Sequence, residues 1–462
     1  MAEAPAATAG DSELLTGWGR TAPTRAQVHR PRGRDQVRRL LAEPGGRGVI
    51  ARGLGRSYGD AAQNAGGQVL DLTQLASLRE FDVGRGRVEV DAGLSLDALI
   101  RHALPAGWFI PVSPGTRQVT VGGAIAADIH GKNHHRDGGF CEHVESFELL
   151  TATGQTMTVT PGDSPALFGA TAGGMGMTGM ILAATLRLTP VETALMRVDT
   201  ERAADLDDVM ARMEAGDDGY RYSVAWIDCL ARGGRLGRSV LTRGEHAARD
   251  ELPADAAANG AAPALAEGPA LTAPPWAPAA LLSLTTIRLF NDLWFHRAPA
   301  EERGRLQGIS SFFHPLDGIR GWNRLYGARG LLQYQFVVPF GEEEVVREVL
   351  ERVSSAGRAS FLAVIKRFGG GRGGLSFPIP GWTLALDLPA GDGELVALLD
   401  GLDGLVAGAG GRVYLAKDSR LRPELLEAMY PDLPAWREEC ARVDPEGRLR
   451  SDLSRRLGLR AP

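Results

Sequence analysis

The chain has almost no lysine. Of its 51 lysine and arginine residues only three are lysines, Lys132, Lys366 and Lys417. Arginine keeps its proton in proteins, whereas a buried lysine can lose it, and the lysine ammonium is a compact point charge rather than a planar fork. Because arginine occupies nearly every other basic position, we predict that the three lysines meet in one active site. Chance survival in an arginine-rich chain is the alternative for any one of them.

Cysteine is equally scarce, and long apolar runs are absent. Cys141, Cys229 and Cys440 are widely spaced and odd in number, so neither a disulfide framework nor a structural zinc site is indicated. No apolar run approaches the roughly 18 residues of a spanning helix, and Glu3 stands where a signal peptide carries a basic residue. We expect a soluble chain with neither a signal peptide nor a spanning helix.

The chain also lacks an excess of positive charge. Its net charge of −5 argues against a nucleic-acid partner, because such proteins normally present a basic face. A hydrophobic content of 44% suffices for large cores. At about 150 residues per domain, the length predicts two to three domains.

Glycine is abundant in the N-terminal half, where it forms three clusters. The first lies in residues 52–60, between predicted strands at 48–51 and 68–72. Its spacing is G-x-G-x-x-x-G and no helical pattern follows, which argues against a Rossmann dinucleotide site. Successive backbone N–H groups in such a loop can still hold a phosphate.

The other two glycine clusters lie in residues 114–123 and 173–179. The former opens a short helix of small residues, and the latter precedes an apolar run. Between the first two clusters we predict a helix over residues 95–104, capped by Ser95. Three glycine loops in one half of the chain favour an extended, phosphate-bearing cofactor.

The second half of the chain has a different character. An Ala/Pro-rich stretch between residues 244 and 299 cannot be regular structure throughout, so we expect a mobile loop near 250–300. Four apolar residues in it form a candidate lid or membrane contact: Trp276, Leu281, Leu282 and Leu284. Strands are predicted at 220–226, 332–338 and 412–416.

A family resemblance is carried by residues 18–20, 52–60, 115–126, 128–135, 313–317, 332–336, 375–382 and 416–420. These segments resemble the FAD-binding oxidases of the vanillyl-alcohol oxidase type and, within that group, the decaprenylphosphoryl-ribose 2′-oxidase family. The resemblance covers nearly the whole chain, and the run His-Gly-Lys-Asn-His-His that begins at His130 is quite specific.

The resemblance implies an α+β fold with two domains. Residues 11–192 and 411–462 would form the FAD-binding domain, and residues 193–410 a substrate-binding domain built on an antiparallel sheet. Residues 1–10 would be a disordered tail.

The resemblance also implies a reaction. FAD would oxidise the 2′-hydroxyl of decaprenylphosphoryl-β-D-ribose to the 2′-keto intermediate, the first half of an epimerisation that makes the arabinose donor for the actinobacterial cell wall. An NADH-dependent keto-reductase subunit would complete the epimerisation. Since the substrate carries a lipid, we expect contact with a membrane surface, on a side that the sequence leaves open.

Individual site residues follow from the same resemblance. Catalytic roles fall to Lys417, His130 and Tyr58. The cofactor-binding residues are Arg52, Gly53, Leu54, Gly55, Arg56, Ser57, Tyr58, Gly115, Thr116, Arg117, Gln118, Val119, Thr120, Gly123, Ala124, Asp128, His130, Gly131, Asn133, His134, Gly179, Ile181 and Tyr414. The substrate-binding residues are Lys132, Trp226, Phe313, Gln333, Gln335, Lys366, Phe368, Thr383, Ala385 and Lys417.

The catalytic residues have alternatives. Lys417 is a base if neutral and an electrostatic stabiliser if cationic, and a surface salt bridge with Asp418 is its structural alternative. His130 is either a flavin contact or a buried structural histidine. Tyr58 either packs by the flavin or is exposed in its loop.

Other residues are equally open to a second interpretation. Gln333 and Gln335 alternate along one strand face, which suits either a polar pocket or a solvated sheet face. A metal site of His130, His134 and His135 is a further alternative, but the surrounding glycines favour a nucleotide, so no metal is predicted.

Two departures from the family pattern have consequences. Many relatives attach FAD covalently to a histidine of the first glycine loop, where this chain has Arg56, so the FAD would be noncovalent. Ala385 stands where well-known family members have a cysteine to which nitroaromatic inhibitors bond. We therefore expect weak inhibition by such compounds with activity retained.

Two other functions stay open at this point. The chain could be a soluble sugar or alditol oxidase that uses oxygen, which would turn over lipid-free polyols well. It could also be a flavin-binding subunit that scaffolds the reductase without turnover, in which case Lys417 would be dispensable.

Overall fold

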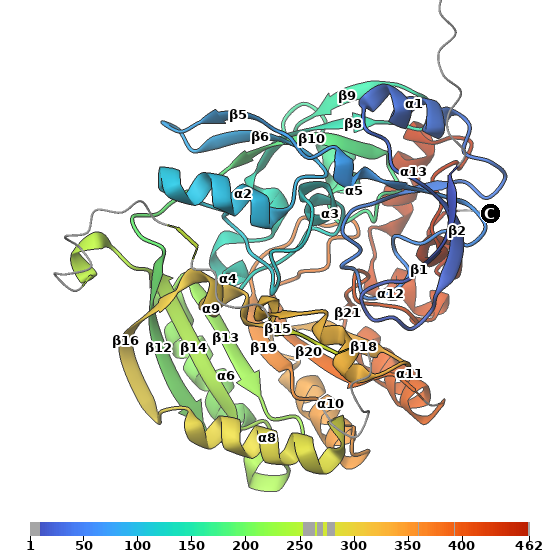
Figure 1. The fold of residues 1–462 in the computed structure, drawn as a ribbon. Helices are drawn as coiled ribbons and strands as arrows, with labels where there is room; N and C mark the ends of the chain where they lie inside the picture. The colour runs from blue at the N-terminus through green and yellow to red at the C-terminus, as the bar shows by residue number, and fades with distance from the viewer. Residues whose placement is uncertain are drawn as a thin grey trace, which may run out of the picture.

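The computed structural model describes residues 10–252, 264–265, 271–274, 282–358, 360–391 and 393–460. This part combines helices with mostly antiparallel sheets, which confirms the predicted α+β class. Figure 1 shows the N-terminal elements (blue to cyan) beside the C-terminal helices (red), with the largest sheet (green to orange) below them. Most of the predicted tail, residues 1–9, lies outside the described residues.

Two smaller sheets build the N-terminal part. One has the order β1-β2-β4-β3, formed by β1 (Asp11–Leu15), β2 (Thr24–His29), β3 (Val49–Arg52) and β4 (Gln68–Asp71). The other has the order β5-β6-β10-β8-β9, formed by β5 (Leu78–Asp82), β6 (Arg87–Asp91), β8 (Val144–Leu150), β9 (Thr156–Val159) and β10 (Met180–Arg187). The apolar run that follows the third glycine cluster forms the middle strand β10, which is buried on both faces.

Short helices pack against these sheets. The helix predicted at 95–104 is α2 (Leu96–Ala103), and the Ser95 hydroxyl caps it by accepting the N–H of Ala98 at 3.1 Å. The small residues after the second glycine cluster form α3 (Val121–Ala126). The neighbouring helices are α1 (Arg34–Ala42), α4 (His134–Asp137) and α5 (Pro165–Thr171).

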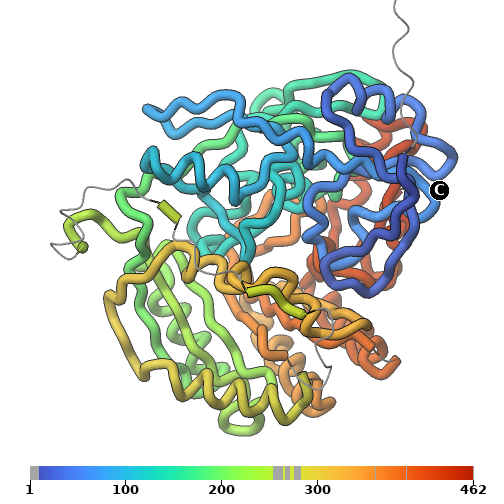
Figure 2. Tube along the Cα trace, in the orientation of Figure 1, coloured from blue at the N-terminus to red at the C-terminus, as the bar shows by residue number. Residues whose placement is uncertain are grey.

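The C-terminal segment returns to the N-terminal sheets, as Figure 2 shows by the red tube beside the blue one. Leu449 forms a parallel bridge with Val49, and Arg456 pairs with Asp60 at 2.8 Å. Helix α13 (Leu433–Val443) lies against α5, where the Trp436 indole N–H donates to the Ala170 carbonyl at 2.8 Å. Residues from both ends of the chain therefore share one core.

The largest sheet has eight strands in the order β16-β12-β14-β13-β19-β20-β18-β21. They are β12 (Leu195–Ala203), β13 (Tyr222–Ile227), β14 (Ser239–His246), β16 (Glu301–Gly308), β18 (Leu331–Pro339), β19 (Ala363–Phe368), β20 (Gly381–Pro389) and β21 (Arg412–Val413). Helices α6 (Leu206–Gly216), α10 (Glu343–Ser355) and α11 (Gly393–Gly408) pack against it.

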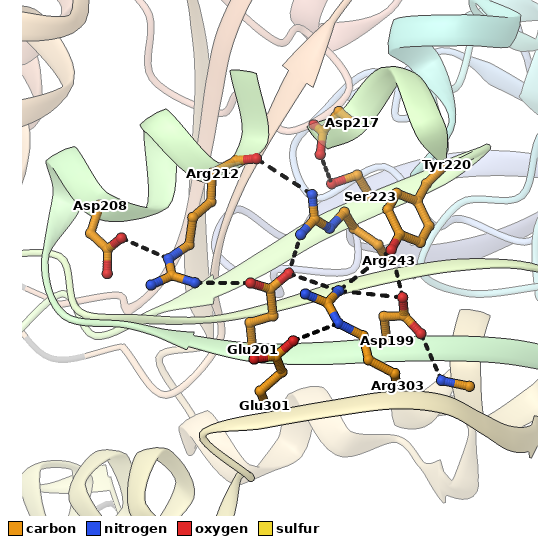
Figure 3. A network of polar contacts seen from close by, with 11 residues as sticks. Asp199, Glu201, Asp208, Arg212, Asp217, Tyr220, Ser223, Arg243, Glu301 and Arg303 are labelled. Atoms are coloured by element: carbon orange, nitrogen blue, oxygen red, sulfur yellow. Dashed lines mark hydrogen bonds and ion pairs between the residues drawn. The ribbon is translucent and has the colours of Figure 1, made fainter. Parts of the chain in front are cut away.

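A network of charged side chains holds one edge of this sheet (Figure 3). The Glu201 carboxylate on β12 accepts from Arg243 on β14, from Arg212 on α6 at 2.9 Å and from Arg303 on β16 at 3.2 Å. A buried carboxylate is stable only with such partners. Because strand side chains alternate between faces, Val198 and Thr200 of β12 point to the opposite side of the sheet.

The prediction of a mobile loop in the Ala/Pro-rich stretch falls largely on residues that the structure does not describe. Trp276, Leu281 and most of residues 253–281 lie outside the described residues. The prediction of a loop up to about residue 300 is wrong from Leu284 onward, where α8 (Leu284–Arg297) forms. Ser283 caps this helix by accepting the N–H of Thr286, and no proline interrupts the chain until Pro299.

No helix within the described ranges is both long enough and apolar enough to cross a bilayer.

Candidate active site

A cavity of about 850 Å³ lies between the N-terminal part and the largest sheet. Residues 52–58, residues 113–116 and the start of α3 line one side of it. Side chains of β12, β13, β14, β18, β19 and β20 line the other side, and the turn after β21 supplies Tyr414, Ala416 and Lys417. The cavity thus draws on segments from both ends and the middle of the chain.

The first glycine loop presents free backbone donors to this cavity. The N–H groups of Leu54, Gly55, Arg56 and Ser57 have no hydrogen-bond partner among the described residues. Gly55 has a φ of 64°, a left-handed conformation that glycine adopts without strain. Successive free N–H groups in a turn form a concavity that suits an anion such as a pyrophosphate.

Glycines also keep this wall of the cavity free of side chains. A Cβ at Gly53 would lie 2.2 Å from Oγ1 of Thr120, so the loop packs directly on the cap of α3. A Cβ on Gly115 would meet no atom within 4 Å, because Gly115 borders the open cavity. The residues present therefore fit an extended dinucleotide such as FAD.

The loop is held in place by its neighbours. The N–H of Tyr58 donates to the Ala416 carbonyl at 2.9 Å, which joins the loop to the turn that carries Lys417. The Arg56 guanidinium lies 3.9 Å from the centre of the Trp18 ring. The first glycine loop and the turn that carries Lys417 are therefore joined directly.

His130 is buried and lines the cavity. Its Nε2 is 3.0 Å from the Gln335 amide nitrogen, and its Nδ1 is 3.2 Å from Nζ of Lys366. The same Gln335 amide donates to Oγ1 of Thr383, so its N–H₂ end faces both groups. A neutral imidazole that accepts at Nε2 must carry its proton on Nδ1, and the Lys366 amine then accepts it.

The protonation states agree with this arrangement. Burial, followed by the charge of Lys366, holds the pKa of His130 well below its ordinary value, so the ring is neutral. Burial, with smaller contributions from the other two lysines, lowers the pKa of Lys366 to about 7. Near neutral pH, Lys366 is thus available as a neutral amine.

Lys132 lies against an aromatic wall. Its ammonium donates to the Phe312 carbonyl and lies 4.1 Å from the centre of the Phe312 ring. Burial lowers its pKa to about 7.

Lys417 lies 4.0 Å from the centre of the Tyr58 ring. Burial lowers its pKa below the ordinary value, and the Asp387 carboxylate opposes this shift. The alternative of a salt bridge with Asp418 is wrong, because Asp418 is buried and pairs with Arg456 at 2.9 Å. All three lysines of the chain line the same cavity.

Most of the predicted site residues line the cavity. Those that do are Arg52, Gly53, Leu54, Gly55, Arg56, Ser57, Tyr58, Gly115, Thr116, Val119, Thr120, Gly123, His130, Gly131, Lys132, Gly179, Ile181, Trp226, Phe313, Gln333, Gln335, Lys366, Ala385, Tyr414 and Lys417. Those that do not are Arg117, Gln118, Ala124, Asp128, Asn133, His134, Phe368 and Thr383.

Three of the residues outside the lining contact neighbouring residues of the site or of the fold around it. Asp128 accepts the N–H of Cys141 at 3.0 Å and the Ser376 hydroxyl at 2.6 Å. Arg117 pairs with Asp97 at 2.5 Å. The Phe368 ring lies 4.9 Å from that of His130.

The histidine run divides among separate partners. His134 accepts the N–H of Gly369 at 3.2 Å, and Nε2 of His135 lies 3.0 Å from the Tyr220 carbonyl. Within the described ranges, no group of three or more His, Cys, Asp or Glu side chains could hold a metal ion.

Ala385 lies on β20, paired with Gln335 on one side and Val364 on the other. It lines the cavity, whereas Cys141, Cys229 and Cys440 are buried and do not. No cysteine thiol therefore faces the cavity.

Two features of the site were not predicted from the sequence. Asp387 stands behind Gln333, and the signal for it was a carboxylate two residues after Ala385 on the same face of an otherwise apolar strand. The far end of the cavity is lined by Trp294, Arg297 and Arg305, which lie in or just after the stretch predicted as a loop.

Comparison with known proteins places these features in a family. A model of the FAD binding domain matches residues 26–160. The chain is 46% identical over 455 residues to the decaprenylphosphoryl-beta-D-ribose oxidase of Mycolicibacterium smegmatis, covering 97% of this chain and 98% of that protein.

Two further similarities differ in extent. An uncharacterised protein from the mprA 5′ region of Streptomyces coelicolor is 46% identical over 376 residues, which is 79% of this chain and all of that protein. Cytokinin dehydrogenase 10 of rice (Oryza sativa subsp. japonica) is 33% identical over 162 residues, 33% of this chain and 29% of that protein. With its glycine cradle and near full-length similarity, the chain belongs to the decaprenylphosphoryl-β-D-ribose oxidase family of FAD-dependent oxidoreductases.

Proposed function

We propose that this protein oxidises the 2′-hydroxyl of decaprenylphosphoryl-β-D-ribose to the 2′-ketone. The observation that carries the proposal is the convergence of all three lysines on one cavity that also holds the free N–H groups of the glycine loop. The full-length relative that bears the name of this oxidase supports the choice of substrate.

The reaction breaks a C–H and an O–H bond of the substrate and forms a C=O bond. Bound FAD supplies the acceptor for the hydride. The protein must bind the sugar, accept the hydroxyl proton and stabilise the negative charge that develops. The neutral Lys366 amine would accept the hydroxyl proton once its one lone pair turns from the Nδ1–H of His130 toward the sugar, and Lys417, which lies over the Tyr58 ring, would stabilise the negative charge.

The cavity extends beyond this polar centre. Toward α8 its lining mixes polar side chains, among them Arg297, Glu302 and Arg305, with an apolar surface formed by Val198, Val224, Trp226, Val240, Trp294, Ala298 and Pro299. Such a surface suits a polyprenyl chain, which gains free energy by leaving water. The sugar would then lie at the lysines and the lipid would leave the cavity beside α8.

Helix α8 carries an apolar face where the lipid would emerge. Leu289, Phe290, Leu293 and Trp294 are 60%, 41%, 62% and 47% exposed. The opposite side of the helix is anchored by the buried Ile287 and by the Asn291 amide, which donates to Asp228 at 2.7 Å. We assign this outward apolar face to contact with the bilayer that holds the substrate.

The proposed membrane contact predicts that vesicle binding can be lost without loss of turnover. We expect Leu289→Glu with Leu293→Glu to reduce cosedimentation with anionic phosphatidylglycerol vesicles at least tenfold, since each leucine contributes about 1.5–3 kcal/mol when buried. Turnover of a water-soluble short-chain analogue should stay the same. The control replaces the exposed Leu14 and Val396 by glutamate. Equal vesicle binding by both double variants would contradict the assignment.

The FAD is proposed to be noncovalent, because the glycine loop offers Arg56 rather than a histidine. Denaturation followed by filtration should release all of the flavin. Flavin that stays with the precipitated chain would refute noncovalent binding.

The ketone leaves the reaction half finished, since an epimer forms only when the carbonyl is reduced again with the opposite configuration. We propose an NADH-dependent keto-reductase as the partner that performs this step. Mixing the two purified proteins with the lipid-linked ribose and NADH should yield the arabinose epimer, and the ribose compound alone would argue against the partnership.

Substrate competition tests the proposed function against a soluble polyol oxidase. We expect kcat/KM for a polyprenyl-phosphoryl ribose to exceed that for free ribose or an alditol at least a thousandfold, with the 2′-ketone as product. Comparable turnover of lipid-free polyols with release of peroxide would establish the other enzyme instead.

A further inference from the structure

Asp387 is a buried carboxylate beside the cavity. It lies on β20 with no exposed surface and does not line the cavity, because the Gln333 side chain stands between. One carboxylate oxygen accepts from the Gln333 amide, and the other, Oδ2, has no hydrogen-bond partner among the described residues. A buried carboxylate with a single hydrogen bond is costly unless a cation compensates it.

Gln333 links Asp387 to Tyr58, the residue of the glycine loop that lies against Lys417. Its amide N–H₂ group donates to Asp387 and also to the Tyr58 hydroxyl at 3.3 Å. The face of the Tyr58 ring in turn lies 4.0 Å from the Lys417 ammonium. Asp387, Gln333, Tyr58 and Lys417 thus form one connected group drawn from four separate segments.

Among the described residues, Lys417 is the cation that can pair with the Asp387 carboxylate. Tyr58 and Tyr326 are the other ionisable groups that interact with Asp387, and burial, reinforced by that carboxylate, raises the pKa of each, so both are neutral phenols. Burial raises the pKa of Asp387 to about 7, and Lys417 is the cation that opposes this shift.

Lys417 is otherwise surrounded by groups that disfavour its charge. Lys366 and His130 are its basic neighbours, and its charge lowers the pKa of both. The Arg56 guanidinium lies over the Trp18 ring, and its charge lowers the pKa of Tyr58. Asp387 is therefore the one acid among the described residues that favours the ammonium form of Lys417.

We propose that Asp387 is a positioning residue that acts as the buried counter-ion of Lys417, keeping it cationic and, through Gln333, fixing the Tyr58 ring against which it lies. A fixed cation at this place stabilises the negative charge that develops as a hydroxyl is oxidised. The bearing on catalysis rests on the proposed function, whereas the coupling between the two charges does not.

The scarcity of lysine makes the coupling directly measurable. Holoenzyme labelled with ¹³Cε-lysine contains only three labelled side chains, and Lys132→Arg and Lys366→Arg assign them by elimination. In Asp387→Asn we expect the titration midpoint of Lys417 to fall by at least one pH unit, a tenfold loss of proton affinity. An unchanged midpoint in the folded variant would overturn the proposal, whatever the substrate proves to be.

Asp217 provides a matched control. It is likewise fully buried, accepts one hydrogen bond, from the Ser223 hydroxyl at 2.7 Å, and has one oxygen without a partner. Its basic neighbours are His135, Arg367 and Arg243 rather than Lys417. Asp217→Asn should leave the Lys417 midpoint where it is, and an equal shift in both variants would refute a specific counter-ion.

A second measurement covers the case in which Asp387→Asn does not fold. Lys417→Met leaves Asp387 buried without its cation and should lower the Tm at pH 8. Adding Asp387→Asn to Lys417→Met removes the second charge as well, so the double variant should fold and melt above Lys417→Met. A double variant that melts below Lys417→Met would contradict the pairing.

Discussion

Lys417→Ala is expected to lower kcat for the oxidation about a thousandfold while FAD stays bound. Removing one group that stabilises developing charge typically costs a factor of about 10²–10³, and loss of an acid–base group costs a similar amount. Anaerobic stopped-flow absorbance would measure the rate of flavin reduction directly. The flavin content after purification shows whether the variant still binds FAD.

Lys417→Arg separates charge from shape. Arginine keeps a positive charge but spreads it over a planar fork, so partial recovery relative to alanine would show that charge at this place is what matters. Flavin reduction by Lys417→Ala within about threefold of the natural protein would contradict the catalytic role. If the epimerisation with the reductase also continued undiminished, the protein would be a scaffold rather than the oxidase.

Gly115→Leu is expected to give a folded protein that does not retain FAD. A Cβ at this position meets no atom of the protein within 4 Å, so the side chain is accommodated by the fold and occupies the cavity instead. Overlap with a bound group costs about 3 kcal/mol, which corresponds to roughly a hundredfold loss of affinity. Flavin fluorescence after denaturation, set against protein concentration, measures the bound fraction.

Gly234→Leu is the matched control. Gly234 is exposed, is equally free of neighbours within 4 Å and lies outside the cavity, so this variant should retain FAD in full. Circular dichroism of both variants should match that of the natural protein. Full FAD content in Gly115→Leu would mean that the cofactor does not lie against Gly115.

Local patterns predicted the parts of the site that depend on backbone chemistry. The Ser95 cap, the strands at 48–51 and 68–72 and the loop between them follow from residue types at fixed spacing, and the structure has the helix and both strands where they were predicted. The lysines were recognised because composition made them rare. Such signals need no knowledge of distant contacts.

Features that depend on long-range packing could not be predicted in this way. The strand predicted at 412–416 ends at Val413, because the chain turns there and the N–H of Lys417 bonds to the Tyr414 carbonyl at 2.9 Å. Helix α8 was not predicted, because it follows directly on an Ala/Pro-rich stretch and the predicted loop extended over it. The division into a FAD-binding and a substrate-binding domain stays a prediction, and β21 pairs with β18 across its proposed boundary.

An anaerobic absorbance titration tests the central claim most directly. The purified holoenzyme would be mixed with a polyprenyl-phosphoryl ribose in the absence of oxygen and of the reductase. We predict that the oxidised flavin band bleaches with the lipid-linked sugar, one equivalent of ketone forming per flavin. A band that stays oxidised with this compound but bleaches with a free polyol would contradict the proposed function.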